Sequence, residues 1–148
     1  MSGRTLARLP LEFYYVSLNA QIWRDRVLST TAEMDLFLNE LMAALESAGY
    51  SQADVRAVRA ALAEAIHNAI RHGHGDDSTK QVRLHYCVAD DCFLAEVQDE
   101  GTGFSYTALA GRPGAACRGL ALMLRHMTWV EHNESGNCVT LCKYRSQE

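Results

Sequence analysis

The apolar residues of this chain follow two different periods, which divide it into helical and extended parts. Between residues 30 and 72 they recur every three or four positions, as on one face of a helix. Between residues 82 and 97 they alternate with polar residues, as in strands that bury one face. The pattern therefore predicts helices first and a sheet afterwards.

The helical part divides into two predicted helices joined by a very short turn. The first begins at Thr30, which has a glutamate three residues later as in a capping box, and ends at Gly49, which suits a C-terminal cap. Its apolar series is Met34, Phe37, Leu38, Leu41, Met42, Leu45 and Ala48. The second helix begins at Ser51, and we expect it to run to about His72.

The extended part consists of short segments rich in β-branched and aromatic residues. Predicted strands cover residues 13–18, 22–28, 82–88, 93–97, 128–132 and 138–144. The stretch 105–117, rich in Gly and Ala, has no clear period and predicts a loop, and a helix is expected from Gly119 to about Met127. Turns at 89–91 and 134–137 make antiparallel hairpins of the strands that flank them.

This order of elements predicts an α+β fold, a two-layer α/β sandwich with helices on one face of a mixed, mainly antiparallel sheet. The chain has 148 residues and contains no repeat or linker. We therefore expect a single domain over residues 1–148, with the polar residues 1–10 frayed.

Composition excludes several classes of function. Net charge is −4, only two of the 14 basic residues are lysines, and no basic run exists, which argues against nucleic acid as a partner. No apolar run approaches the ~20 residues that span a membrane, and no secretion signal precedes the first strand. Five cysteines without a Cys-x-x-Cys pair fit reduced thiols, so we expect a soluble cytoplasmic protein.

Two segments place polar side chains beside the predicted core. Glu64, Asn68 and His72 fall at i, i+4 and i+8 of the second helix, in one row next to its apolar stripe. Asp99 continues the inward face of the strand 93–97, where a carboxylate needs a donor from backbone, water or ligand. These segments are expected to form one pocket.

The residue types in this pocket are those that a nucleotide site requires. Asp99 can accept from an exocyclic amine, and Gly101 and Gly103 allow the backbone to approach a ligand. The carbonyl oxygen of Asn68 can join a magnesium shell, and Glu64 can orient or deprotonate a nucleophile. Arg118 and the amides that begin the helix at Gly119 can meet phosphates.

Each signal has a simpler interpretation when taken alone. A Gly-x-Gly after a strand is commonly a plain turn, and Glu64 with Asn68 is commonly a solvated helix edge. The glycine-rich fingerprints of the Rossmann fold and of the P-loop are absent.

Taken in order, however, three segments resemble the motifs of the GHKL family of ATP-binding domains, whose Bergerat fold histidine kinases and gyrase-type ATPases share. Residues 64–73 resemble its N box, residues 99–104 its G1 box, and residues 118–123 the last part of its G2 box. The resemblance spans about residues 12–145 and is greatest to the bacterial anti-sigma factor serine/threonine protein kinases.

The resemblance implies a role for each matching residue. Asn68 would bind magnesium, Glu64 would act as catalytic base, and Asp99 would hold the adenine amino group. The implied ATP contacts are Asn68, His72, Asp99, Gly101, Gly103, Arg118, Gly119, Leu120 and Asn137. His72 would tether the following loop, and residues 105–117 would be the ATP lid.

It also implies partners. Such kinases phosphorylate a serine or threonine of an anti-anti-sigma protein with a STAS domain, which competes with a sigma factor for the kinase. The same likeness suggests a homodimer, for which the N-terminal strand and helix are our expected surface.

Three departures keep a second interpretation open, a nucleotide-binding regulatory module that works by protein binding only. The lid looks shorter than usual, Cys117 stands where the G2 box commonly has its first glycine, and Asn137 occupies the place of a threonine near the adenine. A histidine-kinase catalytic domain or a gyrase-type ATPase is less favoured, because we expect neither a dimerisation helix pair nor a transducer domain here.

Overall fold

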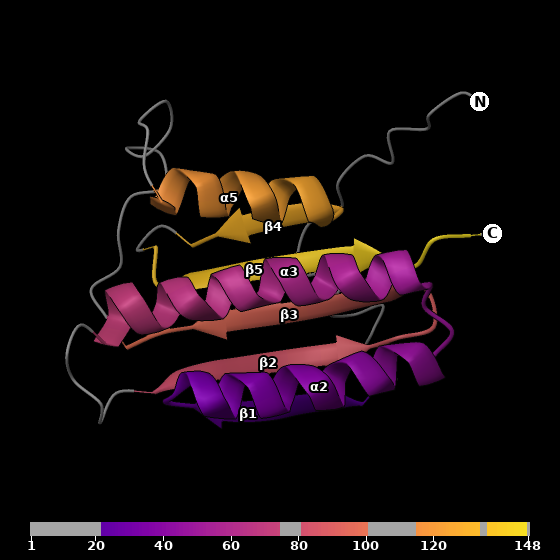
Figure 1. Cartoon of the computed structure of the whole chain (residues 1–148), viewed down its shortest axis with the longest axis horizontal. Coiled ribbons are helices and arrows are strands. Elements are labelled where there is room, and N and C mark those ends of the chain that lie inside the picture. The colour runs from indigo at the N-terminus through magenta and orange to yellow at the C-terminus, as the bar shows by residue number, and fades with distance from the viewer. Residues whose placement is uncertain (1–21, 75–80, 101–114, 134–135, 148) are drawn as a thin grey trace.

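The computed structural model describes residues 22–74, 81–100, 115–133 and 136–147, which form a sheet with helices packed on one face (Figure 1). In chain order the elements are β1 Trp23–Leu28, α2 Thr31–Ser47, α3 Gln52–Asn68, the π-helix η1 Ala69–His74, β2 Val82–Val88, β3 Cys92–Gln98, α5 Ala115–His126, β4 Trp129–His132 and β5 Cys138–Tyr144. The described strands lie in the order β1-β2-β3-β5-β4.

This arrangement confirms the predicted α+β sandwich. Helices α2, α3 and α5 all lie on the same side of the sheet (Figure 1). Every pairing between described strands is antiparallel, so this part of the sheet is not mixed. The short strand predicted at 22–28 is confirmed as β1, whereas the one predicted at 13–18 lies outside the described residues.

Local side-chain hydrogen bonds start the two long helices where the sequence predicted. The Thr30 hydroxyl accepts from the Glu33 amide at 3.2 Å, and the Ser51 hydroxyl accepts from the Asp54 amide at 3.1 Å. Gly49 ends the first helix with a φ of 89°, a conformation that side chains disfavour. The sharp turn between α2 and α3 therefore follows from three local residues, Gly49, Ser51 and Asp54.

The main core lies between the helices and the sheet. On β2 and β3 the inward residues alternate as predicted, and the register sets Leu84 opposite Val97. Its largest fully buried members include Phe37, Leu38, Leu45, Leu62, Ile66, Leu84, Phe93, Met123 and Leu141. Each such side chain contributes roughly 1.5–3 kcal/mol by leaving water.

A smaller apolar cluster lies on the other face of the sheet. It contains Cys87, Ala89, Cys92, Leu94 and Cys142, with Trp23, Trp129 and Tyr144 packed against it. Burial raises the pKa of the Cys87 thiol to about 11, so this thiol is protonated and a poor nucleophile at neutral pH. The described cysteines are free thiols.

Two predicted helix boundaries were wrong. Helix α5 begins at Ala115 rather than Gly119, so Cys117 lies in a helix and not in the predicted loop. The periodicity of apolar residues did not reveal this first helical turn, because alanines favour a helix but do not mark a hydrophobic face. Helix α3 ends at Asn68, and η1 continues the chain to His74 with the wider π pattern.

Polar groups form hydrogen bonds between separate segments at the end of the molecule where α3 begins. The Asp54 side chain, 2% exposed, accepts from the Ser146 amide at 2.8 Å and from the Ser146 hydroxyl at 2.6 Å. The Arg145 amide donates to the Asp91 carbonyl at 2.8 Å, and the Tyr50 hydroxyl donates to the Ala89 carbonyl at 2.7 Å. These bonds join the C-terminal segment, the start of α3 and the β2–β3 turn.

The ionised form of Asp54 is stabilised in the folded chain. Burial acts to raise its pKa, but the hydrogen bonds from Ser146 outweigh that effect and hold the pKa below its ordinary value of 3.8. The stabilisation is therefore fully present above pH 3.8 and is lost as the pH falls through the lower folded-state pKa.

We predict that Asp54→Asn lowers the free energy of unfolding by about 2 kcal/mol at pH 7, because a charged acceptor of two hydrogen bonds becomes a neutral one. The difference in free energy of unfolding between this variant and the wild-type chain becomes smaller as the pH falls below 3.8. Urea unfolding at several pH values measures it. The exposed Asp35→Asn is the matched control and shows no such loss. A pH-independent difference would contradict the role assigned to the ionised carboxylate.

Candidate functional site

Three of the predicted site residues meet where α5 crosses α3. A Cβ atom added to Gly119 would lie 2.7 Å from Glu64 Oε2 and 3.5 Å from Asn68 Nδ2. A side chain at position 119 would therefore have to displace the Glu64 carboxylate, whereas its contact with Asn68 would be an ordinary one. Gly119 follows Asn68 by 51 residues in the chain, and only the packing of the helices brings the two segments together.

Asn68 is a buried amide without a hydrogen bond. It is 3% exposed, and neither its Oδ1 nor its Nδ2 has a partner among the described residues. Leaving such a group unsatisfied costs about 1–3 kcal/mol. An unsatisfied amide of this kind is typical of a position whose partner is a ligand, ion or water.

Asp99 reaches the same cavity from the sheet. It follows β3, is 8% exposed, and its amide donates to the Asn137 carbonyl at 2.9 Å. Asp99 and Asn68 line one narrow cavity together with Ala65, Ala69, Val97, Gly136, Asn137, Cys138 and Val139. The structure thus brings together the two segments from which the sequence predicted a pocket.

A wider cavity of about 320 Å³ opens beside the narrow one. Asp99 and Asn137 line both, and Arg83, Gln98 and Glu100 complete the wider one. Burial, together with the nearby charges of Glu96 and Asp99, raises the pKa of the Cys138 thiol to about 11. Cys138 is accordingly a neutral thiol in the wall of a cavity that holds a carboxylate.

The remaining predicted residues are placed only in part. Gly101, Gly103 and most of the predicted lid lie outside the described residues. Arg118 lies in the first turn of α5 and His72 in η1, but their side chains are outside the described part. Leu120 is half-buried and packs against the main core.

The row predicted for Glu64, Asn68 and His72 is described as far as Asn68. Glu64 and Asn68 are one α-helical turn apart in α3, as expected. Beyond Asn68, hydrogen bonds of the π-helix span five residues rather than four, so four positions no longer complete a turn. The α-helical spacing from which the row was predicted therefore ends at Asn68, and the side chain of His72 lies outside the described part.

The structure adds Asn133, which the sequence prediction missed. Its Oδ1 accepts from the Asn137 and Cys138 amides, each at 3.1 Å, and its Nδ2 donates to Asn137 Oδ1 at 2.7 Å. Asparagine commonly binds its own backbone in turns, so an Asn at the start of the predicted 134–137 turn was the available signal.

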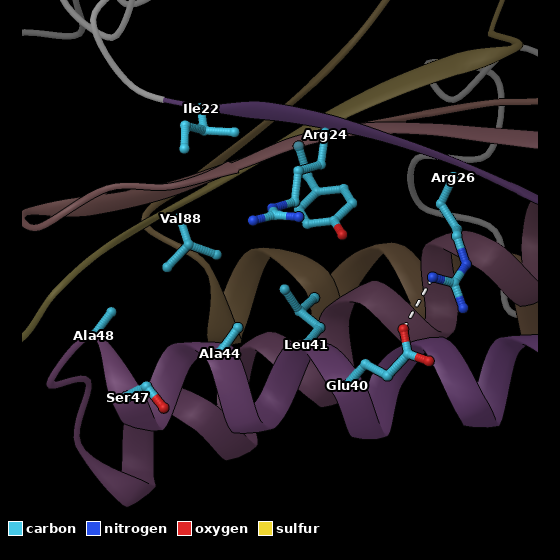
Figure 2. A pocket seen from close by; sticks show the side chains of 10 residues that line it. Ile22, Arg24, Arg26, Glu40, Leu41, Ala44, Ser47, Ala48 and Val88 are labelled. Atoms are coloured by element: carbon cyan, nitrogen blue, oxygen red, sulfur yellow. Dashed lines mark hydrogen bonds and ion pairs between the residues drawn. The ribbon is translucent and has the colours of Figure 1, made fainter.

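A separate groove lies away from these residues. It has a volume of about 580 Å³ and lies between β1 and α2, where Leu41 and Ala44 face Ile22 and Arg24 (Figure 2). Its ion pair joins Arg26 to Glu40 at 2.9 Å, as the dashed line in Figure 2 shows. No predicted site residue lines this groove.

The described residues fit a magnesium ion only if it arrives with a bound anion. Among them, no three His, Cys, Asp or Glu side chains converge on a metal position. Magnesium commonly binds through one or two protein oxygens plus phosphates and water, and the unsatisfied Asn68 Oδ1 fits one such ligand. In the described part of the chain, no helix is long and apolar enough to cross a membrane.

Because Asn68 is buried and unsatisfied, we predict that Asn68→Leu raises the free energy of unfolding by about 1–3 kcal/mol. Leucine has a similar shape and needs no hydrogen bond. Urea unfolding measures the change, and Asn39→Leu, at an exposed position of α2, is the control that gains nothing. Destabilisation by Asn68→Leu would show that the amide is satisfied in the ligand-free chain.

Comparison with known proteins agrees with this geometry. The family model of the histidine kinase-like ATPase domain matches residues 27–143, which covers every described element except the first part of β1 and the end of β5. No curated protein matches the chain. The chain belongs to the family of histidine kinase-like ATPase domains.

Proposed function

We propose that this chain is an ATP- and magnesium-dependent serine/threonine protein kinase that acts as an anti-sigma factor. The observation that carries the proposal is the unsatisfied buried amide of Asn68, which shares a cavity with the buried Asp99. Membership of a family of ATPase domains supports the nucleotide. The kinase activity and the pathway are supported by the resemblance of residues 64–73, 99–104 and 118–123.

The proposed site has a base end and a phosphate end. At the base end, the Asp99 carboxylate accepts a hydrogen bond from the adenine amino group, with Gly101 and Gly103 leaving room for the ring. At the phosphate end, Arg118 and the free amides of the first turn of α5, which begins at Ala115, donate to phosphate oxygens. The amides of Gly119 and Leu120, which the sequence prediction placed at the helix start, lie in the second turn and bond within the helix.

The chain's own catalytic group in this proposal is Glu64. Magnesium, when bound through Asn68, neutralises charge on the phosphates. Glu64 accepts the proton of the partner's serine or threonine hydroxyl, and that oxygen bonds to the γ-phosphorus as the bond to ADP breaks. Gly119 supports this role because its missing side chain leaves the space that the Glu64 carboxylate occupies.

The partners follow from the resemblance alone. We propose that the phosphate acceptor is an anti-anti-sigma protein with a STAS domain, that a sigma factor competes with it, and that the kinase works as a homodimer in the cytoplasm.

The alternative is a module that binds nucleotide and partner but transfers no phosphate. The position of Cys117 favours it, because α5 begins at Ala115 and a cysteine therefore occupies the first turn of the helix that would face the phosphates.

For the binding step, we predict that Asp99→Asn weakens ADP binding at least tenfold, since the amide is a poorer acceptor than a carboxylate. Isothermal titration of ADP into the full chain measures the affinity. Asp90→Asn, in the exposed β2–β3 turn, is the control and binds as the wild-type chain does. An unchanged affinity of Asp99→Asn for ADP would contradict the proposed contact between Asp99 and the adenine amino group.

For the transfer step, we predict that Glu64→Gln retains ADP binding but slows phosphorylation of a STAS partner by 10²–10⁴-fold, roughly the contribution of a general base. Radiolabelled ATP and candidate STAS proteins provide the assay, and Glu46→Gln, exposed on α2, is the control. ADP binding by the wild-type chain without any transfer would favour the binding-only module.

A further inference from the structure

The turn between β4 and β5 contains a hydrogen-bond network with one internally consistent assignment of its amides. Asn133 Oδ1 faces two backbone donors, the amides of Asn137 and Cys138, each at 3.1 Å. The atom of Asn133 that faces them must be its oxygen, because an NH₂ group there would meet only other donors. Its Nδ2 is therefore the atom that lies 2.7 Å from the Asn137 side chain.

This assignment decides the orientation of the next amide. The atom of Asn137 that faces Asn133 Nδ2 must be an acceptor, so it is Oδ1. The Nδ2 of Asn137 consequently lies on the side away from Asn133 and makes no hydrogen bond to a described residue. Asn133 thus holds Asn137 with its donor group outward.

Asn137 is also coupled to Asp99. Its carbonyl accepts from the Asp99 amide at 2.9 Å, and both residues line the narrow cavity and the wider cavity beside it. Two residues that line the same cavities therefore carry complementary groups, an acceptor in the Asp99 carboxylate and a donor in Asn137 Nδ2.

We propose that Asn137 Nδ2 donates a hydrogen bond to N1 of the purine base, and that Asn133 is the positioning residue that makes it a donor. This inference rests on the proposed nucleotide site. Adenine presents an amino donor at C6 and an acceptor at N1, which complement Asp99 and Asn137. Hypoxanthine presents the reverse pair, an oxygen at C6 and an N–H at N1, and so meets like groups at both positions.

The experiment compares three nucleotides by isothermal titration with the full chain: ADP, 1-deaza-ADP, which lacks the N1 acceptor, and inosine diphosphate. The wild-type chain is expected to bind ADP about tenfold more tightly than 1-deaza-ADP, the difference that one hydrogen bond supplies. Asn137→Ala is expected to reduce this ratio to less than about threefold, because the donor is gone.

Asn133→Asp isolates the positioning role. A carboxylate still accepts from both backbone amides, so the turn is kept, but it offers an acceptor to Asn137 in place of a donor. The Asn137 amide is expected to rotate, so that its oxygen faces the base. ADP and 1-deaza-ADP should then bind with equal affinity. The ratio of the affinities for ADP and inosine diphosphate should fall about tenfold. An unchanged melting temperature in Asn133→Asp verifies that the turn is intact.

The outcomes separate this inference from the function on which it rests. The inference alone would be overturned if the wild-type chain, Asn137→Ala and Asn133→Asp all bound ADP with the same ratios of affinity among the three nucleotides. Equal affinity of the wild-type chain for ADP and 1-deaza-ADP would also overturn it. Failure of the wild-type chain to bind ADP would overturn the proposed function and this inference together.

Discussion

The close packing of α5 on α3 at Gly119 is the constraint on which the candidate site depends. A Cβ at this position would lie 2.7 Å from Glu64 Oε2, so a side chain there would displace the Glu64 carboxylate. The contact holds Glu64 and Asn68 under the first turns of α5 while Asp99 reaches the neighbouring cavity from the sheet. A helix layer on one face of an antiparallel sheet brings these three segments together, although they are far apart in the chain.

The two ends of α3 each contain a buried polar side chain, and the two differ in their hydrogen bonding. At its start, Asp54 is buried and satisfied by two hydrogen bonds from Ser146, which fasten the C-terminal segment. At its end, Asn68 is equally buried, yet no described residue satisfies it. The first arrangement stabilises the fold, whereas the second lowers stability and leaves ligand-binding capacity. One helix therefore joins an end that stabilises the fold to an end that lines the candidate site.

Much of the fold was predictable because local rules determine it. Thr30, Gly49 and Ser51 set the helix boundaries through hydrogen bonds and backbone conformation within a few residues, and alternation along β2 and β3 identified the inward face that ends at Asp99. The errors arose where a helix gave no periodic signal, at Ala115 in α5, and where its geometry changed, after Asn68. Neither depends on residue type alone.

The sequence by itself determined the elements, the inward position of Asp99 and the α-helical spacing of Glu64 and Asn68, since these follow from periods of two and 3.6 residues. Only the tertiary structure decided that Gly119 packs on Glu64, that Asn68 lacks a partner, and that Asn133 orients Asn137. These facts depend on which segments lie side by side and on where each hydrogen-bond donor finds its acceptor. No local pattern contains that information, because burial and satisfaction are properties of the packed chain.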